Sequence, residues 1–295
     1  MSARSLPSKP VVGLLSALAG AALLACSRPG LAQEAVPAPQ AAPPPPAVAA
    51  PVSPAAAAAA CAKIWIGHEA EYEEMLRSAP VAHMEQIPFG VTHPKRIYFA
   101  PGLPFASAAW KPLLPGKYAG FQESYRSEIA AYELDKLLGL QMVPPTVERK
   151  LGAQTGAVIL WVENVKGWDT KADIRGPDPV AWARELVRMK MFDALCGNID
   201  RNQGNLLYDA EYHVVLIDHS RAFVDTQDMT KFQKYLFVDR PLWERMQALT
   251  LESAQPTLGK WVSKGMLLAM LQRRDRMKAE IDRMLAARGD NVWLR

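Results

Sequence analysis

The sequence predicts an α+β fold with two lobes, a small strand-rich lobe followed by a larger helical lobe. Between residues 84 and 163, short apolar runs alternate with turn residues, a pattern typical of strands. A polar, glycine-containing segment follows at 163–177. After it, apolar residues recur mainly at helical spacing. These three observations place the lobes at about 84–163 and 178–295, within a domain that covers residues 63–295.

The charge balance of the chain is close to neutral. It carries 34 basic and 30 acidic side chains, a net charge of +4. This gives no electrostatic basis for binding nucleic acid or an anionic membrane. The apolar content of 49% and the charged content of 22% are ordinary for a globular protein.

The first 32 residues have the composition of a signal peptide. Arg4 and Lys9 precede an uncharged apolar stretch at 11–25, which is short for a membrane span but typical of a secretory leader. We therefore expect an exported protein. An uncleaved apolar N-terminus or a misassigned start codon is the alternative.

Two processing sites fit this leader. Leu23-Leu24-Ala25-Cys26 resembles a bacterial lipobox, which implies a lipid on Cys26 and a membrane-anchored lipoprotein. Gly30-Leu31-Ala32 fits ordinary signal peptidase, which implies a periplasmic or secreted protein. Both stay open.

Residues 33–62 are almost entirely Ala and Pro, a composition that favours extended conformations and predicts a disordered linker. Of the three cysteines, Cys61 and Cys196 could pair in an oxidising compartment. A buried free thiol is the other interpretation of Cys196. No Cys/His spacing in the sequence indicates a zinc site.

The strand-rich lobe is expected to begin after a short charged helix, Glu69–Ser78, which Pro80 ends. Three strands are predicted at 86–91, 96–100 and 105–111. A helix follows at 126–138, capped by Ser124 and ended by Gly139. Residues 143–147 read as an extended connection, and 157–162 as a buried strand.

The helical lobe is expected to begin at Asp178-Pro179, a capping residue followed by proline at the first helical position. This helix leads into a loop at Asp200. Two short strands, 206–208 and 214–217, form a hairpin. The chain is predicted to be helical from Phe223 to its end. This order of elements is that of the protein-kinase-like fold.

Three polar residues in this lobe have the spacing of a phosphoryl-transfer site. Asp200 stands five residues before Asn205 and eighteen before Asp218, which closes the apolar run 214–217. Asp200 would take the proton of an acceptor hydroxyl, and Asn205 and Asp218 would hold a magnesium ion on the phosphates of ATP. Two Asx-rich turns flanking a hairpin would give a similar pattern.

The strand-rich lobe offers two further candidates. Lys111 closes an apolar strand and is the candidate for contacting the phosphates, although an exposed strand-end lysine is the ordinary alternative. Glu128, near the start of the next helix, is its candidate ion-pair partner, with Glu133 as the rival. There is no Gly-x-Gly-x-x-Gly loop. Gly90 is the one glycine available to a phosphate-covering turn between the first two strands.

These motifs resemble those of the atypical kinase clan, which includes phosphatidylinositol 3- and 4-kinases, HipA-like kinases and the Golgi casein kinase family. The resemblance rests on Gly197-Asn198-Ile199-Asp200-Arg201, on Gly204-Asn205 and on Ile217-Asp218-His219, within a stretch from about 87 to 223. It implies that Trp161 to Asn164 form the adenine-binding hinge. The chain departs from conventional kinases in having His219 and Ser220 where Phe and Gly usually follow the metal-binding Asp.

The resemblance implies an ATP- and Mg- or Mn-dependent kinase with a hydroxyl acceptor, which could be a protein Ser/Thr, a lipid or a sugar. An exported pseudokinase that binds nucleotide or acts as a scaffold is the alternative, because ATP is scarce outside the bacterial cytoplasm. Nucleotidyl transfer from ATP is a third hypothesis. Acceptor choice resides in loops that carry no motif here.

Overall fold

The computed structural model describes residues 61–88, 94–169, 176–226, 229 and 236–294. Within these ranges the fold is α+β, with a strand-rich lobe followed by a helical lobe, which confirms the predicted fold class. The predicted signal peptide with Cys26, most of the predicted linker, and Gly90 lie outside the described residues. None of the described helices is both long and apolar enough to cross a membrane.

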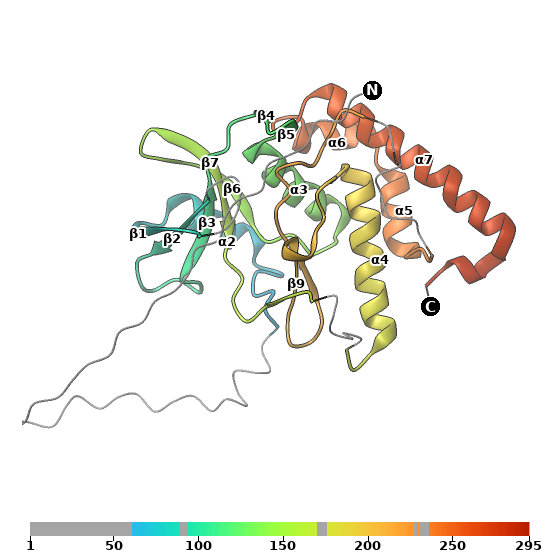
Figure 1. Ribbon diagram of the computed structural model, residues 1–295, viewed down its shortest axis with the longest axis horizontal. Helices are drawn as coiled ribbons and strands as arrows, with labels where there is room; N and C mark the ends of the chain where they lie inside the picture. Colours follow the sequence, from blue (N-terminus) through green and yellow to red (C-terminus); the bar gives the residue numbers. More distant parts are fainter. Residues whose placement is uncertain (1–60, 89–93, 170–175, 227–228, 230–235, 295) are drawn as a thin grey trace, which may run out of the picture. The chain divides into compact units, whose positions relative to one another are not determined.

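A five-stranded antiparallel sheet forms the first lobe (Figure 1). Its strand order is β1-β2-β3-β7-β6. The strands are β1 (Val81–Gln86), β2 (Lys95–Phe99), β3 (Ser107–Lys111), β7 (Gln154–Leu160) and β6 (Thr146–Leu151). Strand β3, which ends at Lys111, is therefore central and has a neighbour on each side.

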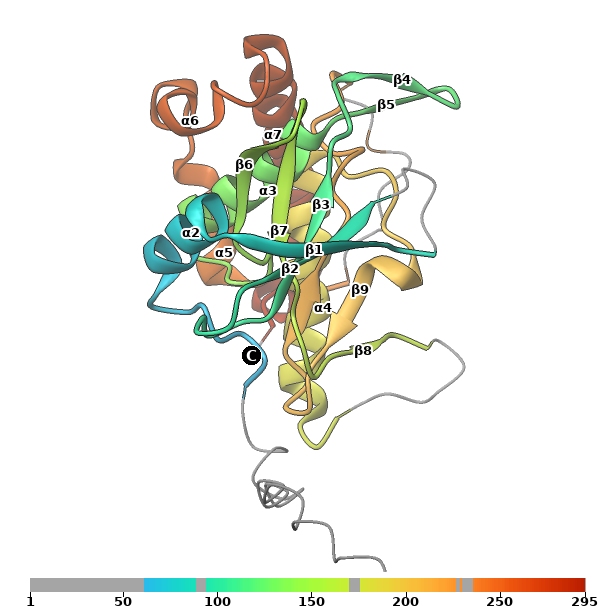
Figure 2. The ribbon, with the colours of Figure 1, turned by 90° about the vertical axis from the view of Figure 1, so that its left-hand side faces the viewer.

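Two helices cover opposite faces of this sheet (Figure 2). Val158 and Leu160 of β7 share a hydrophobic cluster with α2 (Glu69–Ser78), whereas Ala157 and Ile159 pack with α3 (Tyr125–Leu138). The split follows from the two-residue repeat of a strand, which sends successive side chains to opposite faces. Lys111 pairs with Ala157 across β3 and β7, so it faces α3.

Helix boundaries follow their capping residues. The Ser124 hydroxyl accepts the N–H of Arg126 at 3.0 Å and starts α3, and Gly139 ends it in the left-handed region at φ 55°. Asp178 caps α4 (Pro179–Cys196) in the same way, by accepting two backbone N–H groups.

The helical lobe is built around α4. Its other elements are β8 (Lys166–Gly167), the 3₁₀ turn η1 (Gln203–Asn205), β9 (Leu206–Tyr208), β10 (Val214–Leu216), α5 (Arg240–Ala248), α6 (Leu251–Leu258), α7 (Lys264–Arg288) and the 3₁₀ turn η2 (Gly289–Val292). The predicted hairpin corresponds to β9 and β10. It connects the loop that carries Asp200 and Asn205 to Asp218.

The first strand lies earlier than the predicted 86–91. Strand β1 is Val81–Gln86, and its side chains are mostly exposed, so it lacks the apolar alternation that identifies a half-buried strand. The ladder is completed by the bond from Ile87 N to Pro94 O, and Pro88 has no N–H to extend it.

Other expectations are also corrected. A short hairpin, β4 (Gly116–Tyr118) and β5 (Phe121–Glu123), precedes α3 and was not predicted. The extended connection at 143–147 leads into strand β6, and the linker at 163–177 contains β8. Among the described residues after Phe223, helix begins only at Arg240, because Asp239 caps α5 at that point.

Close packing against the backbone of β3 leaves no room for a side chain at Gly156 on β7. A Cβ at this position would lie 2.4 Å from Lys111 O and 2.6 Å from Pro112 Cα. We expect Gly156→Ala to lower the free energy of unfolding by about 1–3 kcal/mol, measured by urea denaturation. Gly167→Ala is the matched control, since nothing lies within 4 Å of its Cβ position. Equal stability of the two variants would contradict the packing argument.

Candidate active site

A cavity of about 550 Å³ is lined by residues of both lobes. Four of the five predicted site residues line it, namely Lys111, Asp200, Asn205 and Asp218. Apolar side chains line it as well: Ile87, Ala109, Ile159, Val162, Leu207 and Ile217. The cavity is therefore lined by both apolar and charged side chains.

Lys111 lies between two carboxylates. Its Nζ donates to Glu128 Oε1 at 2.7 Å and to Asp218 Oδ1 at 2.8 Å. Burial by itself lowers the pKa of Lys111, but the two carboxylates outweigh it and the net shift is upward. The lysine is therefore held as a cation at the end of β3.

Glu128 is buried and uses both carboxylate oxygens. Oε1 accepts from Lys111, and Oε2 accepts the backbone N–H of His219 at 2.8 Å. The rival candidate Glu133 pairs instead with Lys136 at 3.2 Å. Helix α3 is thus tied to β3 and to the residue after Asp218 through one side chain.

Asp218 has an uncommon backbone conformation, with φ at 60°. Non-glycine residues rarely adopt this region, and such strain concentrates at functional sites. Burial raises the pKa of Asp218, but Lys111 and the hydroxyl of Ser220 outweigh it and lower the pKa to about 2. The carboxylate is therefore ionised at neutral pH.

The loop after α4 holds Asp200 and Asn205 side by side. The Asn205 side-chain amide donates to Asp200 O at 3.1 Å. Asp200 Oδ2 accepts from Arg221 at 3.0 Å, and Arg221 also binds Glu123 at 2.7 Å. The Asp200 side chain is 37% exposed, so its carboxylate remains open to the cavity.

Arg201 joins this loop to the segment around Asp218. Its guanidinium binds Asp193 with two hydrogen bonds of 2.9 Å, from Nε and from one terminal nitrogen. The other terminal nitrogen donates to Asn205 O at 2.6 Å and to Ile217 O at 2.8 Å. A fifth bond, of 2.8 Å, reaches His219 Nε2. All five N–H groups of the side chain are thereby used.

His219 is buried and neutral. Burial lowers its pKa well below the usual value, and the nearby charge of Arg201 adds to the effect. Because arginine only donates, Nε2 is the acceptor, so the ring proton is assigned to Nδ1. The ring meets Phe192 of α4 edge to face, with ring centroids 5.9 Å apart.

The segment Trp161 to Asn164 also lines the cavity. Trp161 N donates to Ser107 O at 3.2 Å, which fixes the segment to β3. Arg96 stacks on the Trp161 ring at 4.1 Å and pairs with Glu163 at 2.6 Å. A chain segment at the edge of an apolar slot can accept a flat heteroaromatic ring.

The donor set of the cavity suits a hard divalent cation. Among the described residues, every hydrogen bond of Asp218 uses Oδ1, which leaves Oδ2 for a metal ion. Asn205 engages its side-chain nitrogen with Asp200 O, which leaves its side-chain oxygen. Oxygen ligands of this kind are those that Mg²⁺ and Mn²⁺ prefer. The residues present therefore fit such an ion.

Several residues of this network were missed by sequence reasoning. Arg201 was part of the recognised motif without a role of its own, and its partner Asp193 lies inside α4 with no motif around it. The Arg221–Glu123 pair joins the segment after Asp218 to the unpredicted hairpin β4–β5. The Arg221–Glu123 contact joins distant parts of the chain, and the Arg201–Asp193 contact follows from the turn of the loop after α4, so no helix or strand periodicity marks either pair.

Both described cysteines are free thiols. Cys196 is buried at the end of α4, and burial raises its pKa to about 12. Cys61 is half-buried, and its Sγ lies 3.9 Å from His213 Nδ1.

No protein-family model matches this sequence, and no curated protein matches it. Solved structures match its fold. The crystal structure of the Golgi casein kinase has a TM-score of 0.58 at 15% identity and covers 77% of each chain. The same kinase with Mn/ADP bound has a TM-score of 0.56 at 15% identity, covering 77% of this chain and 78% of that one. The structure of hydra Fam20 with sugar has a TM-score of 0.59 at 15% identity, covering 76% and 91%. The chain therefore has an atypical kinase-like fold.

Removal of Arg201 should destabilise the protein strongly, because Asp193 would remain buried without its partner. We expect Arg201→Met to lower the free energy of unfolding by about 3–5 kcal/mol. Arg283→Met, at a side chain 74% exposed, is the control and should change it by less than about 0.5 kcal/mol. Similar urea midpoints for the two variants would show that the Arg201 network does not hold the loop.

Proposed function

We propose that the chain is an ATP- and divalent-metal-dependent kinase that transfers the γ-phosphoryl group to a hydroxyl acceptor. The observation that carries this proposal is the contact of Lys111 with both Glu128 and Asp218. A lysine–glutamate pair next to a metal-binding aspartate is the arrangement required for phosphoryl transfer in kinases. One of the structures with the same fold holds Mn/ADP, which supports a nucleotide and metal site here.

In this proposal the base of ATP lies in the apolar part of the cavity, against Ala109, Ile159 and the segment Trp161 to Asn164. Lys111 lies at the charged end, where it can bind phosphate oxygens. Asn205 and Asp218 would hold the metal ion, which neutralises phosphate charge and orients the transferred group.

Asp200 is proposed as the general base. Arg221 binds its Oδ2 and fixes the direction of the carboxylate, so Oδ1 is available to accept the proton of an acceptor hydroxyl. Arg201 acts at a distance from the reaction. By holding the carbonyls of Asn205 and Ile217 it fixes the chain just before and just after the β9–β10 hairpin.

We also propose that the protein is exported, either as a lipoprotein anchored through Cys26 or as a periplasmic or secreted protein. The motivation is the leader at residues 1–32 and the Ala/Pro linker that follows it. Export makes a nucleotide-binding or scaffolding pseudokinase the second candidate. Calorimetry with Mn-ATP identifies a scaffold without nucleotide binding, which would give no heat. A nucleotide-binding pseudokinase would give heat but would show no ATP turnover.

Loss of the metal-binding carboxylate should abolish transfer. We expect Asp218→Ala to lower metal-dependent ATP turnover or autophosphorylation by at least about 100-fold, because phosphate charge is no longer neutralised. Asp282→Asn, an exposed acid on α7 that pairs with Lys278, is the matched control and should keep full activity. Equal turnover by the purified wild type and Asp218→Ala would overturn the mechanism.

Loss of the Asp200 carboxylate should slow phosphate transfer without weakening the binding of Mn-ATP. We expect Asp200→Asn to bind Mn-ATP about as tightly as the wild type but to transfer phosphate about 10²–10⁴-fold more slowly. Calorimetry measures the first quantity, and the mass of the modified protein measures the second. An added AMP in place of an added phosphate would identify nucleotidyl transfer instead.

A further inference from the structure

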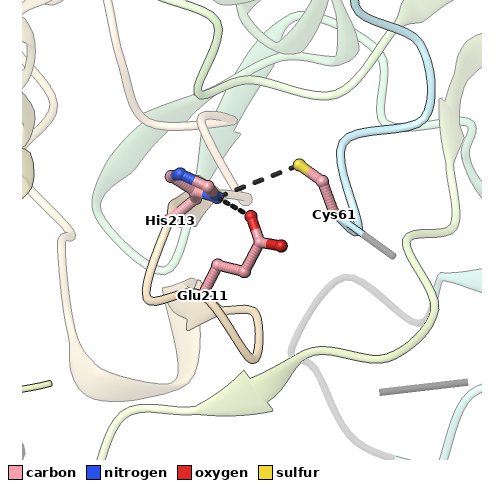
Figure 3. A group of neighbouring side chains, drawn as sticks. All are labelled: Cys61, Glu211 and His213. Atoms are coloured by element: carbon pink, nitrogen blue, oxygen red, sulfur yellow. Dashed lines mark hydrogen bonds and ion pairs between the residues drawn. The ribbon is translucent and has the colours of Figure 1, made fainter. Parts of the chain in front are cut away.

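Cys61, Glu211 and His213 form a cluster away from the cavity (Figure 3). Their ligand atoms all lie within 4.8 Å of one another. Cys61 is the first described residue of the chain, whereas Glu211 and His213 belong to the turn between β9 and β10. None of the three takes part in the proposed phosphoryl transfer.

Three electron-rich atoms surround one nitrogen of His213. Its Nδ1 lies 3.2 Å from Asp209 Oδ2, 3.6 Å from Glu211 Oε2 and 3.9 Å from Cys61 Sγ. A ring nitrogen carries at most one proton, so it can donate to only one of these atoms at a time. A cation bound between these atoms would interact favourably with all of them at once.

The distances from His213 Nδ1 to Glu211 and Cys61 are close to those between neighbouring ligand atoms around a tetrahedral zinc ion, and Cys61 and Glu211 offer ligand atoms within 4.8 Å of each other. Zinc bonds of about 2.0–2.3 Å to nitrogen, oxygen and sulfur place neighbouring ligand atoms about 3.3–3.6 Å apart. The distances of 3.6 Å to Glu211 and 3.9 Å to Cys61 need a shift of only a few tenths of an ångström. A thiolate together with an imidazole favours zinc over the magnesium or manganese proposed for the cavity.

Asp209 holds the backbone segments that carry the ligands of this cluster. It is buried, and its Oδ1 accepts the backbone N–H of Glu211 at 3.0 Å and of His213 at 2.9 Å. Its Oδ2 accepts the N–H of Ala62 at 3.3 Å. One carboxylate therefore positions both parts of the chain that present the ligands.

We infer that Cys61, Glu211 and His213 bind a zinc ion that joins the segment beginning at Cys61 to the β9–β10 turn. A water molecule or Asp209 completes the coordination. The hairpin β9–β10 lies between Asn205 and Asp218, so an ion at its turn anchors the element that spaces the two proposed magnesium ligands. The inference does not depend on the proposed kinase activity.

The test is zinc binding by the full chain, purified under reducing conditions and stripped of metal. We expect calorimetry to show one equivalent of Zn²⁺, and Co²⁺ in its place to give the ultraviolet absorption of a cobalt–thiolate bond. Cys61→Ser and His213→Gln should each weaken zinc binding at least about ten-fold. Cys61→Ser should also remove the thiolate absorption.

Three controls make the result specific. Cys196→Ser removes the other described free thiol, His83→Gln removes an exposed imidazole, and Asp218→Ala removes the proposed nucleotide-site ligand; each should bind zinc like the wild type. Circular dichroism checks that the variants are folded. Wild-type protein that binds no zinc, unchanged affinity in folded Cys61→Ser, or a cobalt spectrum without thiolate absorption would each overturn the inference.

Discussion

The arrangement of the cavity depends on the buried guanidinium of Arg201. It is anchored on Asp193 within α4 and reaches the carbonyls of Asn205 and Ile217, which lie before and after the β9–β10 hairpin. Among the described residues, the Arg201–Asp193 contact is the one ion pair that links the Asp200 loop to α4. A planar side chain with five donors is suited to this task, because lysine has only three and cannot form the two-pronged contact with a carboxylate.

A second chain of contacts connects the two lobes. Lys111 binds Glu128, Glu128 accepts the backbone N–H of His219, and His219 accepts from Arg201. Each polar group here is buried, so leaving one without its partner would cost far more than the bond itself contributes. The groups therefore stabilise one arrangement together. The low pKa of Asp218 is a consequence, since Lys111 is held beside it.

The sequence predicts those features of the fold that depend on residues close together in the chain, such as helix ends and hairpins. Ser124, Gly139 and Asp178 mark helix ends because caps act within a few residues. The hairpin β9–β10 was predicted because its strands are adjacent in the chain. Exposed strand β1 and the hairpin β4–β5 gave no such pattern, since one packs little apolar surface and the other is short.

The sequence by itself determined the α+β fold class, the order of the elements and the spacing of Asp200, Asn205 and Asp218, because spacing and periodicity are properties of neighbouring residues. Only the tertiary structure decided that Glu128 rather than Glu133 meets Lys111, and that Cys61 lies beside His213. It also decided the role of Arg201. These residue pairs depend on how the helices and strands pack on one another. The relative orientation of two such elements is not determined by the sequence pattern within either of them.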